Sequence, residues 1–358
     1  MSVKIWKQRE EQQSEERKYR MKKIKLGVLG LGRIGKMHVD NILTMPEYEI
    51  TVGCDPYLSD ELAESLVAKG IGRCTKDPDE VFNDPKVEAV IICSATATHA
   101  DFIIRAARAG KDVFCEKPID HDVDRIVEAI KAVKAAGVIL QVGFMHRYDR
   151  HHGAIADMVH EGKIGKLEVL KIVERDPMPP SMDYIRVSGG IYVDFMIHDL
   201  DMARYITQSE AVSVFATGTS VCDPEIGELG DFGSGHAFVK FANGALAVLE
   251  TSRRSTFGND QRIEVLGSKG MAIDDNEFNN NVRFFAEDGC HMSKSPWHFQ
   301  ERYKEAFFNE LKVFAEAVRT RTEIAANGFD GLQAVLIAEA AAKSAKSGRM
   351  EPVRTIEI

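Results

Sequence analysis

The first part of the chain alternates short apolar runs with segments in which apolar residues recur every three or four positions. Short apolar runs bounded by turn residues are typical of buried strands, and the intervening periodicity is typical of helices. Strands that alternate with helices predict an α/β fold with a parallel, doubly wound sheet. The expected strands are 24–30, 48–54, 88–93, 111–115 and 138–143, and the expected helices are 33–44, 59–69, 98–109 and 122–136.

After Phe144 the pattern changes to strand-like runs that follow one another without helices between them. Turn signals such as Asn243-Gly244 and Ser268-Lys269-Gly270 join these runs, which predicts a large, mostly antiparallel sheet in an α+β domain. One face should carry helices and a substrate pocket. The other face, if apolar, needs a partner, so we expect a homo-oligomer, either a dimer or a tetramer. The expected strands are 166–174, 211–219, 236–241, 245–251 and 262–266, and the closing helices are 301–318 and 331–346.

These patterns predict three regions. Residues 21–143 should form a Rossmann domain, and residues 144–358 a domain for substrate binding and oligomerisation. Residues 1–20 precede both as an N-terminal extension with mixed charges and no apolar core, which argues against a secretory signal. This extension is either an arm that docks on a neighbouring subunit or the product of an upstream start codon.

Composition excludes several classes of partner. The 358 residues carry a formal net charge of −9 without a basic stripe, which argues against nucleic acid. No run of about eighteen apolar residues exists, so we expect no membrane span. The 6 cysteines are scattered without a C-x-x-C pair, which favours a reducing cytoplasm. No cluster of ligands at zinc-like spacing accompanies the histidines, so we expect no metal.

A glycine-rich turn, Gly30-Leu31-Gly32-Arg33-Ile34-Gly35, follows the first apolar run and opens the first helix. In a dinucleotide site the first glycine permits the tight turn, the second lets backbone approach a pyrophosphate, and the third lets helix pack on strand. The second apolar run ends in Asp55, where a carboxylate can accept hydrogen bonds from both ribose hydroxyls and would repel a 2′-phosphate. No Arg or Lys follows it immediately, so NAD is favoured over NADP.

Two further segments follow predicted strands, at the sheet edge where ligands of α/β proteins bind. The loop from Ser94 through Thr96 to His99 should face the nicotinamide half of the cofactor, although His99 could equally make a structural hydrogen bond. Glu116 and Lys117 follow the run that ends at Cys115. A lysine at that position can hydrogen-bond a reacting hydroxyl and lower its pKa.

The most informative stretch is Ser188 to Asp201, which places Asp194 and His198 four residues apart after a pair of glycines. At helical spacing both side chains would share one face. A carboxylate that holds one ring nitrogen of an imidazole leaves the other nitrogen free to accept a proton, as the oxidation of an alcohol requires. The alternative is a helix N-terminus at which the two side chains merely satisfy one another.

Together these segments resemble the Gfo/Idh/MocA oxidoreductase family over nearly the whole chain from Met21 onward. The strings Arg175–Tyr205 and Ser252–Gly270 are similar to the inositol 2-dehydrogenase branch. The resemblance implies that Lys117, Asp194 and His198 are catalytic, that NAD is the cofactor, and that the substrate is a cyclic polyol or sugar. It also implies substrate contacts for four residues: His146, Arg147, Asp176 and Asn259.

The chain departs from that branch in segments where the family contacts substrate. His146 stands where inositol dehydrogenases usually have an arginine, and Asn259 where they tend to have a tyrosine. Imidazole has less charge and reach than guanidinium, so we expect a weaker grip on a compact all-hydroxyl ring and room for a substituent. A sugar or glycoside dehydrogenase with tightly held, recycled NAD is therefore one alternative. A non-catalytic sensor of NAD or sugar is another, against which the intact catalytic set counts.

Overall fold

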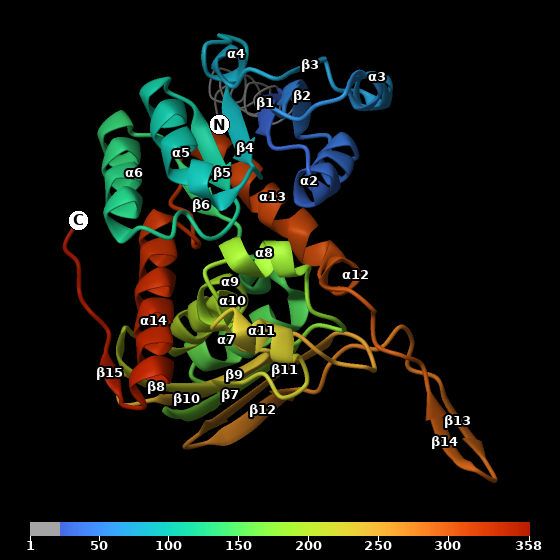
Figure 1. Ribbon diagram of the computed structural model, residues 1–358, viewed down its shortest axis with the longest axis vertical. Helices are drawn as coiled ribbons and strands as arrows, with labels where there is room; N and C mark the ends of the chain where they lie inside the picture. Colours follow the sequence, from blue (N-terminus) through green and yellow to red (C-terminus); the bar gives the residue numbers. More distant parts are fainter. Residues whose placement is uncertain (1–21) are drawn as a thin grey trace, which may run out of the picture. The chain divides into compact units, whose positions relative to one another are not determined.

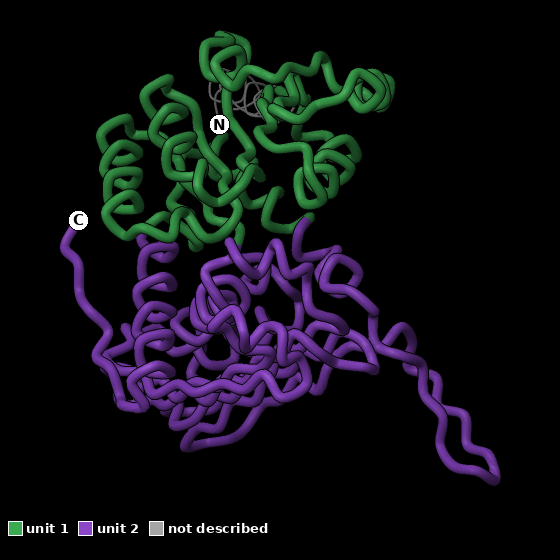
Figure 2. Tube along the Cα trace, viewed as in Figure 1, with its two compact units in different colours: residues 1–143, 308–328 green, residues 144–307, 329–358 purple. Residues whose placement is uncertain are grey.

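The computed structural model describes residues 22–358 (Figure 1). The predicted extension, residues 1–20, lies outside the described residues. The chain divides into two compact units, which are described separately below (Figure 2). Unit 1 contains the described residues up to Gly143 together with Phe308–Gly328, and unit 2 contains Phe144–Phe307 and Phe329–Ile358.

Unit 1 is built on a six-stranded parallel sheet with the order β3-β2-β1-β4-β5-β6. The predicted doubly wound α/β fold is confirmed, and the predicted strands and helices are present with ends shifted by at most a few residues. The sequence prediction omitted the edge strand β3 and the one-turn helix α4, which are too short to show a periodicity. The elements are β1 (Ile24–Leu29), α2 (Arg33–Leu43), β2 (Tyr48–Cys54), α3 (Asp60–Lys69), β3 (Arg73–Thr75), α4 (Asp79–Phe82), β4 (Ala89–Ile92), η1 (Thr96–Thr98), α5 (His99–Arg108), β5 (Asp112–Cys115), α6 (Val123–Ala136) and β6 (Leu140–Val142).

A late segment of the chain completes the core of unit 1. The C-terminal part of α13 (Lys304–Thr320) buries Leu311 and Phe314 in the same apolar cluster as Leu26 and Ile91 of the sheet. The Tyr48 hydroxyl donates a hydrogen bond of 2.5 Å to the Leu311 carbonyl. Phe308–Gly328 therefore belongs to the Rossmann unit, and the prediction that the second domain comprises all of residues 144–358 is wrong for this segment.

Unit 2 is built on a seven-stranded sheet with the order β12-β11-β7-β10-β9-β8-β15. All neighbours pair antiparallel except β7 and β10, which are parallel, so the prediction of a mostly antiparallel sheet is confirmed. The strands are β7 (Leu167–Arg175), β8 (Ala211–Thr219), β9 (Ser234–Phe241), β10 (Leu246–Ser252), β11 (Asp260–Gly267), β12 (Gly270–Asp274) and β15 (Glu351–Pro352). The turn Asn243-Gly244 joins β9 to β10, and Ser268-Lys269 joins β11 to β12, as predicted.

Helices cover one face of this sheet (Figure 1). Apolar side chains of α7, α10 and α14 pack on inward-facing residues such as Leu170, Val239 and Leu249. The opposite face exposes apolar side chains, among them Phe238 and Leu246, which are 52% and 47% exposed. The helices of unit 2 are η2 (Met145–Tyr148), α7 (Arg150–His160), α8 (Met182–Val187), α9 (Ile191–Asp194), α10 (Ile197–Thr207), α11 (Pro224–Glu228), α12 (Phe299–Arg302) and α14 (Gly328–Ser347), together with the first turn of α13.

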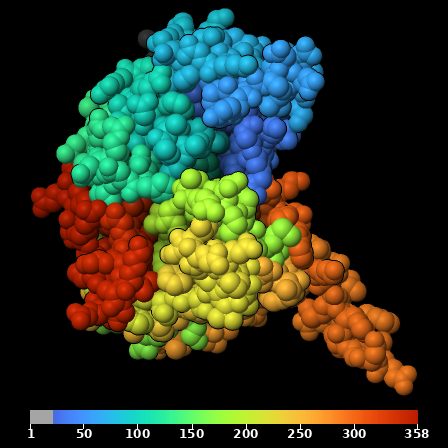
Figure 3. Space-filling view, in the orientation of Figure 1, coloured from blue at the N-terminus to red at the C-terminus, as the bar shows by residue number. Residues whose placement is uncertain are grey.

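A two-stranded hairpin, β13 (Arg283–Ala286) with β14 (Gly289–Met292), projects from unit 2 (Figure 3). Every residue of both strands is exposed, including Phe284 and Phe285 at 64% and 73%. Isolated hairpins are marginally stable in water, so these side chains are candidates for contact with a partner. Within residues 22–358, no helix combines the length and apolar character needed to cross a bilayer.

Candidate cofactor and catalytic residues

The glycine-rich turn of unit 1 has the geometry that a dinucleotide site requires. Gly30 has a φ of +95°, which favours glycine, and a Cβ at Gly35 would lie 2.0 Å from the Gly30 carbonyl oxygen. At Gly32 an added Cβ would meet no atom within 4 Å, so the backbone there is open to a ligand. Helix α2 then begins at Arg33 with no side-chain cap and no acidic residue in its first turn. These residues fit a pyrophosphate, which would meet the N–H groups of the α2 N-terminus.

Asp55 lies directly after β2, beside this turn. Its Oδ2 accepts a hydrogen bond of 2.8 Å from the Leu31 N–H, and its Oδ1 accepts one of 2.9 Å from the Tyr57 N–H. The carboxylate is therefore fixed by two backbone donors and keeps further lone pairs for a ribose. The predicted pairing of a glycine turn with an acidic residue on the neighbouring strand is present.

The remaining cofactor candidates of unit 1 lie in two loops that His99 joins. Its Nδ1 lies 2.8 Å from the Pro118 carbonyl oxygen, and its Nε2 lies 3.0 Å from the Ser94 carbonyl oxygen. The ring is buried, and burial lowers its pKa. Both contacts favour the structural interpretation of His99 over a direct contact with NAD. Thr96 begins η1 in the same loop, and the Ser94 hydroxyl lies 2.6 Å from that of Thr98.

Glu116 and Lys117 follow β5, at the carboxyl end of the parallel sheet, as predicted. Glu116 Oε1 lies 2.7 Å from the Nε2 of His38, a buried residue of α2. The peptide bond between Lys117 and Pro118 is cis. The loop that carries Lys117 is thus tied to the helix that follows the glycine turn.

Asp194 and His198 both lie in unit 2, but they do not share one continuous helix. Asp194 ends α9 and His198 lies in the first turn of α10, with Phe195 and Met196 between the two helices. Asp194 Oδ1 accepts a hydrogen bond of 2.7 Å from the Tyr184 hydroxyl, and its Oδ2 accepts one of 3.0 Å from Arg253. Both side chains are largely buried, Asp194 at 8% and His198 at 7% exposure.

Sequence reasoning assigned no role to Tyr184 and Arg253, which hold Asp194. Arg253 is buried and also contacts Asp231, whose Oδ1 accepts a hydrogen bond from the Ile191 N–H at the start of α9. The sequence did mark both regions, because Tyr184 lies in the Arg175–Tyr205 string and Arg253 in the Ser252–Gly270 string, which resemble inositol 2-dehydrogenases. Nothing in their spacing indicated that they converge on Asp194.

The predicted substrate residues occupy different environments within unit 2. Arg147 makes a two-pronged ion pair with Asp201, at 2.7 and 2.6 Å, and lies 4.8 Å from the Tyr205 ring centroid. Burial raises the pKa of Asp201 to about 6, although Arg147 opposes that shift. Asn259, which is buried, donates a hydrogen bond of 2.9 Å to Oδ1 of the half-buried Asp176. Asp176 and Asn259 are thus hydrogen-bonded to each other, whereas the Arg147 guanidinium forms a buried ion pair with Asp201.

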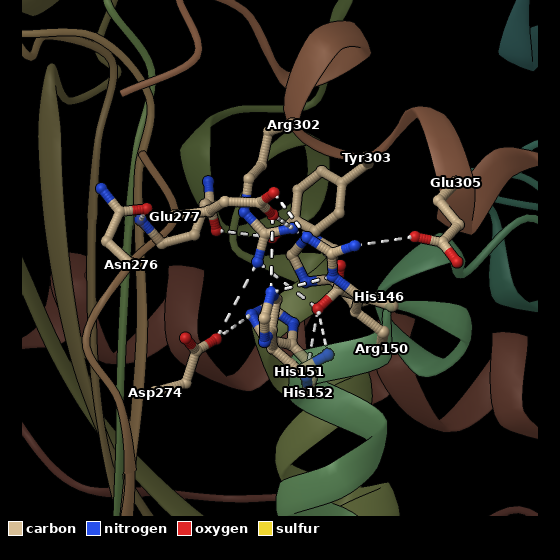
Figure 4. A network of polar contacts seen from close by, with 12 residues as sticks. His146, Arg150, His151, His152, Asp274, Asn276, Glu277, Arg302, Tyr303 and Glu305 are labelled. Carbon is tan, nitrogen blue, oxygen red and sulfur yellow. Dashed lines mark hydrogen bonds and ion pairs between the residues drawn. The ribbon is translucent and has the colours of Figure 1, made fainter. Parts of the chain in front are cut away.

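Next to His146 lies a network of buried ionisable groups (Figure 4). Arg302 donates a hydrogen bond of 2.7 Å to Asp149 Oδ2, and His152 Nε2 lies 3.6 Å from Asp274 Oδ2. Burial lowers the pKa of His152 to about 4. Burial would raise the pKa of Asp149, but Arg302 and His152, which is charged only below about pH 4, outweigh burial and lower the pKa of Asp149 to about 2. Near neutral pH the network is therefore a neutral His152 imidazole beside a charged Arg302–Asp149 pair.

Two sets of His and carboxylate donors in the described residues have ligand atoms within 4.8 Å of one another. In the set around His152, the Arg302 guanidinium already supplies the positive charge. In the other set, burial raises the pKa of Glu310 well above its usual range, which favours a neutral acid. We assign a metal to neither, and the expectation of no metal stays a prediction. The sets are Asp149, His152 and Asp274, and His38, Glu116 and Glu310.

A hollow of about 630 Å³ lies beside the base of the hairpin in unit 2, with Phe257, Phe278 and Trp297 among its lining residues. None of the predicted site residues lines it. We therefore place neither substrate nor cofactor there.

The comparisons decide the family. Residues 24–144 match a model described as an oxidoreductase family with an NAD-binding Rossmann fold, and residues 152–273 match a GFO/IDH/MocA C-terminal domain. The chain belongs to the GFO/IDH/MocA oxidoreductase family. The predicted membership, enzyme class and NAD cofactor are thereby confirmed.

Relatives of known activity cover almost the whole chain. It is 44% identical to a myo-inositol 2-dehydrogenase of Thermotoga maritima, over 91% of this chain and 97% of that one. It is 40% identical to an inositol 2-dehydrogenase of Rhizobium meliloti, over 91% and 98%. Among solved structures, a scyllo-inositol dehydrogenase of Lactobacillus casei with bound NAD(H) and scyllo-inositol matches with a TM-score of 0.87 and 28% identity, over 93% and 99%.

Proposed function

We propose that this protein is an NAD-dependent dehydrogenase that oxidises a secondary ring hydroxyl of an inositol or a closely related cyclic polyol. The observation that carries the proposal is the fixed carboxylate of Asp194, four residues before His198, in a chain that also has the glycine turn and Asp55. Inositol dehydrogenases that match over more than nine tenths of this chain support the substrate class.

Each catalytic residue has one task in the proposed reaction. When bound, NAD supplies the hydride acceptor. His198 accepts the proton of the ring hydroxyl as the C–H bond breaks, which leaves a ketone. Asp194, held by Tyr184 and Arg253, stabilises the imidazolium that forms at His198. Lys117 hydrogen-bonds the reacting oxygen and stabilises its developing negative charge.

The glycoside alternative loses one of its supports. It depended on His146 and Asn259 leaving room for a substituent, but both side chains are buried and the Asn259 amide is bonded to Asp176. We therefore place free inositols first and glycosides second.

The test is turnover on a panel of rings. Purified protein is incubated with NAD and myo-inositol, scyllo-inositol, glucose or an aryl glucoside, and the absorbance of reduced nicotinamide is followed. We expect the highest kcat/KM with an inositol. A clear preference for the aryl glucoside would favour the glycoside alternative. Product that forms only when a keto acceptor is supplied would indicate that NAD is recycled in place.

We also propose that two copies or more assemble through the open face of the unit 2 sheet. Its exposed apolar side chains, including Phe238 and Leu246, form the kind of surface that a partner covers. Light scattering that gives only a 39.8 kDa species at micromolar concentration would contradict this assembly. The free cysteines, including the exposed Cys222 and Cys290, favour a cytoplasmic location.

A further inference from the structure

The ring of His146 lies between two other rings of unit 2. It stacks on His198 with centroids 4.9 Å apart and an angle of 29°, and it lies against Tyr303 at 4.5 Å and 34° (Figure 4 shows the Tyr303 side). His152 approaches it edge-on at 5.2 Å. His146 is only 1% exposed, so its broad faces are occupied by neighbouring side chains. A displacement or change of charge at His146 therefore acts most directly on His198 and Tyr303, the two rings that it contacts face to face.

Two buried carboxyl groups face the edges of the same ring. His146 Nε2 lies 3.7 Å from Glu174 Oε1, and its Nδ1 lies 4.0 Å from Asp199 Oδ1. Burial raises the pKa of Asp199 well above its usual range, and the neighbouring Glu174 only partly opposes that shift. The raised pKa favours the neutral acid at Asp199, so the two carboxyl groups together carry less than two full negative charges beside the ring.

The other ionisable neighbours contribute little net charge. Burial lowers the pKa of His152 to about 4, so this ring is neutral above that pH. Burial also keeps the Tyr303 hydroxyl protonated by raising its pKa, and Arg302 is balanced by Asp149. Negative charge on Glu174 and Asp199 therefore favours a proton on the His146 ring as the pH falls, whereas an arginine at this position would be charged at every pH.

We propose that His146 is a positioning residue for His198: its stacked ring fixes the orientation of the catalytic base, and its state of charge controls how readily that base takes a proton. The inference rests on the proposed function, because it takes His198 as the proton acceptor. This positioning role replaces the substrate contact predicted for His146 from the sequence. A positive charge on one ring opposes a positive charge on the other, since their centroids are 4.9 Å apart.

The experiment compares variants that separate ring stacking from charge. His146→Arg introduces a fixed positive charge, His146→Phe keeps an uncharged ring, and His146→Ala removes the ring. The matched control is His160→Phe, because His160 contacts the Tyr205 carbonyl at the end of α7 and has no part in the proposed reaction. Melting curves establish that each variant is folded. His146→Gln, which is uncharged and of similar size, replaces His146→Phe if that variant fails to fold.

Two readouts are measured for each variant. The first is the pH profile of kcat and kcat/KM with an inositol. In His146→Arg the acid limb should move to lower pH by roughly one to two units, because the fixed charge lowers the pKa of His198. In His146→Ala kcat should fall by about tenfold or more with KM changed less than about twofold. His146→Phe should lose less activity than His146→Ala at the optimum.

The second readout needs no substrate. Nuclear magnetic resonance of labelled histidines, with His198 assigned by a His198→Gln variant, follows the titration of His198 directly. In the wild-type protein His198 should titrate in two coupled steps, and in His146→Phe or His146→Gln in one. This result stands even if no inositol is oxidised, so failure of the proposed function and failure of this inference are distinguishable.

The inference is overturned if His198 titrates identically in wild-type protein and in His146→Arg. It is also overturned if every His146 variant raises KM at least tenfold while kcat and the pH profile stay unchanged. That pattern would make His146 a substrate-binding residue. A shift of the profile in the His160→Phe control would likewise remove the case for a specific effect of His146.

Discussion

The proposed cofactor residues of unit 1 and the proposed catalytic residues of unit 2 are held in place by different means. In unit 1 the turn is set by backbone, because Gly30 takes a positive φ, Gly35 packs against the Gly30 carbonyl, and the Leu31 N–H holds Asp55. In unit 2 Asp194 is held by side chains, one of them Arg253, 59 positions away in the sequence. A site set by backbone, such as the glycine turn, should tolerate changes of neighbouring side chains but lose its geometry when a Cβ is added to a glycine. Side-chain sites fail when one partner in a buried network is lost.

The largest effect should come from removal of the proposed base. His198→Ala should lower kcat by about 10² to 10⁴-fold, because the hydroxyl proton loses its acceptor. The affinity for NAD, measured by calorimetry, should remain within about threefold of wild type, because the glycine turn belongs to unit 1. His160→Ala is the matched control and should retain full activity. Near-normal turnover of His198→Ala would remove the Asp194/His198 pair from the mechanism.

Glycine substitutions test the backbone half of the comparison. A Cβ at Gly35 would lie 2.0 Å from the Gly30 carbonyl oxygen, so Gly35→Ala must shift backbone and should destabilise the protein by about 1–3 kcal/mol. A Cβ at Gly32 meets no atom within 4 Å, and its φ of −72° suits alanine. Gly32→Ala should therefore melt like wild type but bind NAD at least about tenfold more weakly, because the Cβ projects where the pyrophosphate approaches.

The contrast between these two variants is the informative result. If Gly32→Ala bound NAD normally while its stability was unchanged, the pyrophosphate would not approach this turn. A loss of stability in Gly32→Ala equal to that in Gly35→Ala would show that the second glycine has a packing role rather than a ligand role.

The local character of unit 1 explains why its sequence could be interpreted well. Short apolar runs marked the strands of the parallel sheet, and the turn and Asp55 are separated by one strand–helix unit. Each cofactor candidate follows a predicted strand, so periodicity alone placed it at the carboxyl edge of the sheet. What the pattern could not show is that Phe308–Gly328 completes this unit, because a helical stripe does not identify the surface it covers.

Unit 2 was predictable in its sheet but not in its site. The turn residues identified the strands, whereas the role of each polar side chain depended on contacts over long sequence distances. Arg147 was expected near substrate but its guanidinium binds Asp201, 54 residues later. The four-residue spacing of Asp194 and His198 suggested one helix, but the chain forms two, since Phe195 and Met196 interrupt the regular turn. Periodicity carries no information on which ionisable groups meet in a core.

The buried network of unit 2 should make stability depend on pH. Burial lowers the pKa of His152 to about 4 in the folded protein. In the unfolded chain His152 binds a proton below about pH 6.5, whereas in the folded protein it stays neutral until the pH nears 4. This contribution to stability is fully present above about pH 6.5 and is lost as the pH falls toward 4. Urea unfolding at pH 5 should show about 2 kcal/mol less stability from this residue than at pH 7.5. In His152→Phe the free energy of unfolding should depend less on pH between about pH 5 and pH 7.5. An unchanged dependence would mean that His152 is protonated in the folded protein.

The smallest expected effect concerns the choice of cofactor, where a side chain acts within the backbone site. Asp55 Oδ2 accepts a hydrogen bond from the Leu31 N–H and Oδ1 accepts one from the Tyr57 N–H, so the carboxylate fixes the turn. We expect its remaining lone pairs to accept hydrogen bonds from the ribose. Wild-type protein should prefer NAD to NADP, because the negative charge of Asp55 repels the 2′-phosphate of NADP.

The variant Asp55→Asn retains an acceptor for one backbone N–H and removes the charge. It should narrow the preference for NAD over NADP by about tenfold, or about 1.4 kcal/mol, with little loss of stability. Asp55→Ala should narrow it as well but should also lose NAD affinity and stability, because both backbone donors lose their acceptor. The ratio of kcat/KM for the two cofactors measures the effect. If wild-type protein uses NADP as well as NAD, Asp55 does not contact the ribose, and the carboxylate serves only to hold the turn.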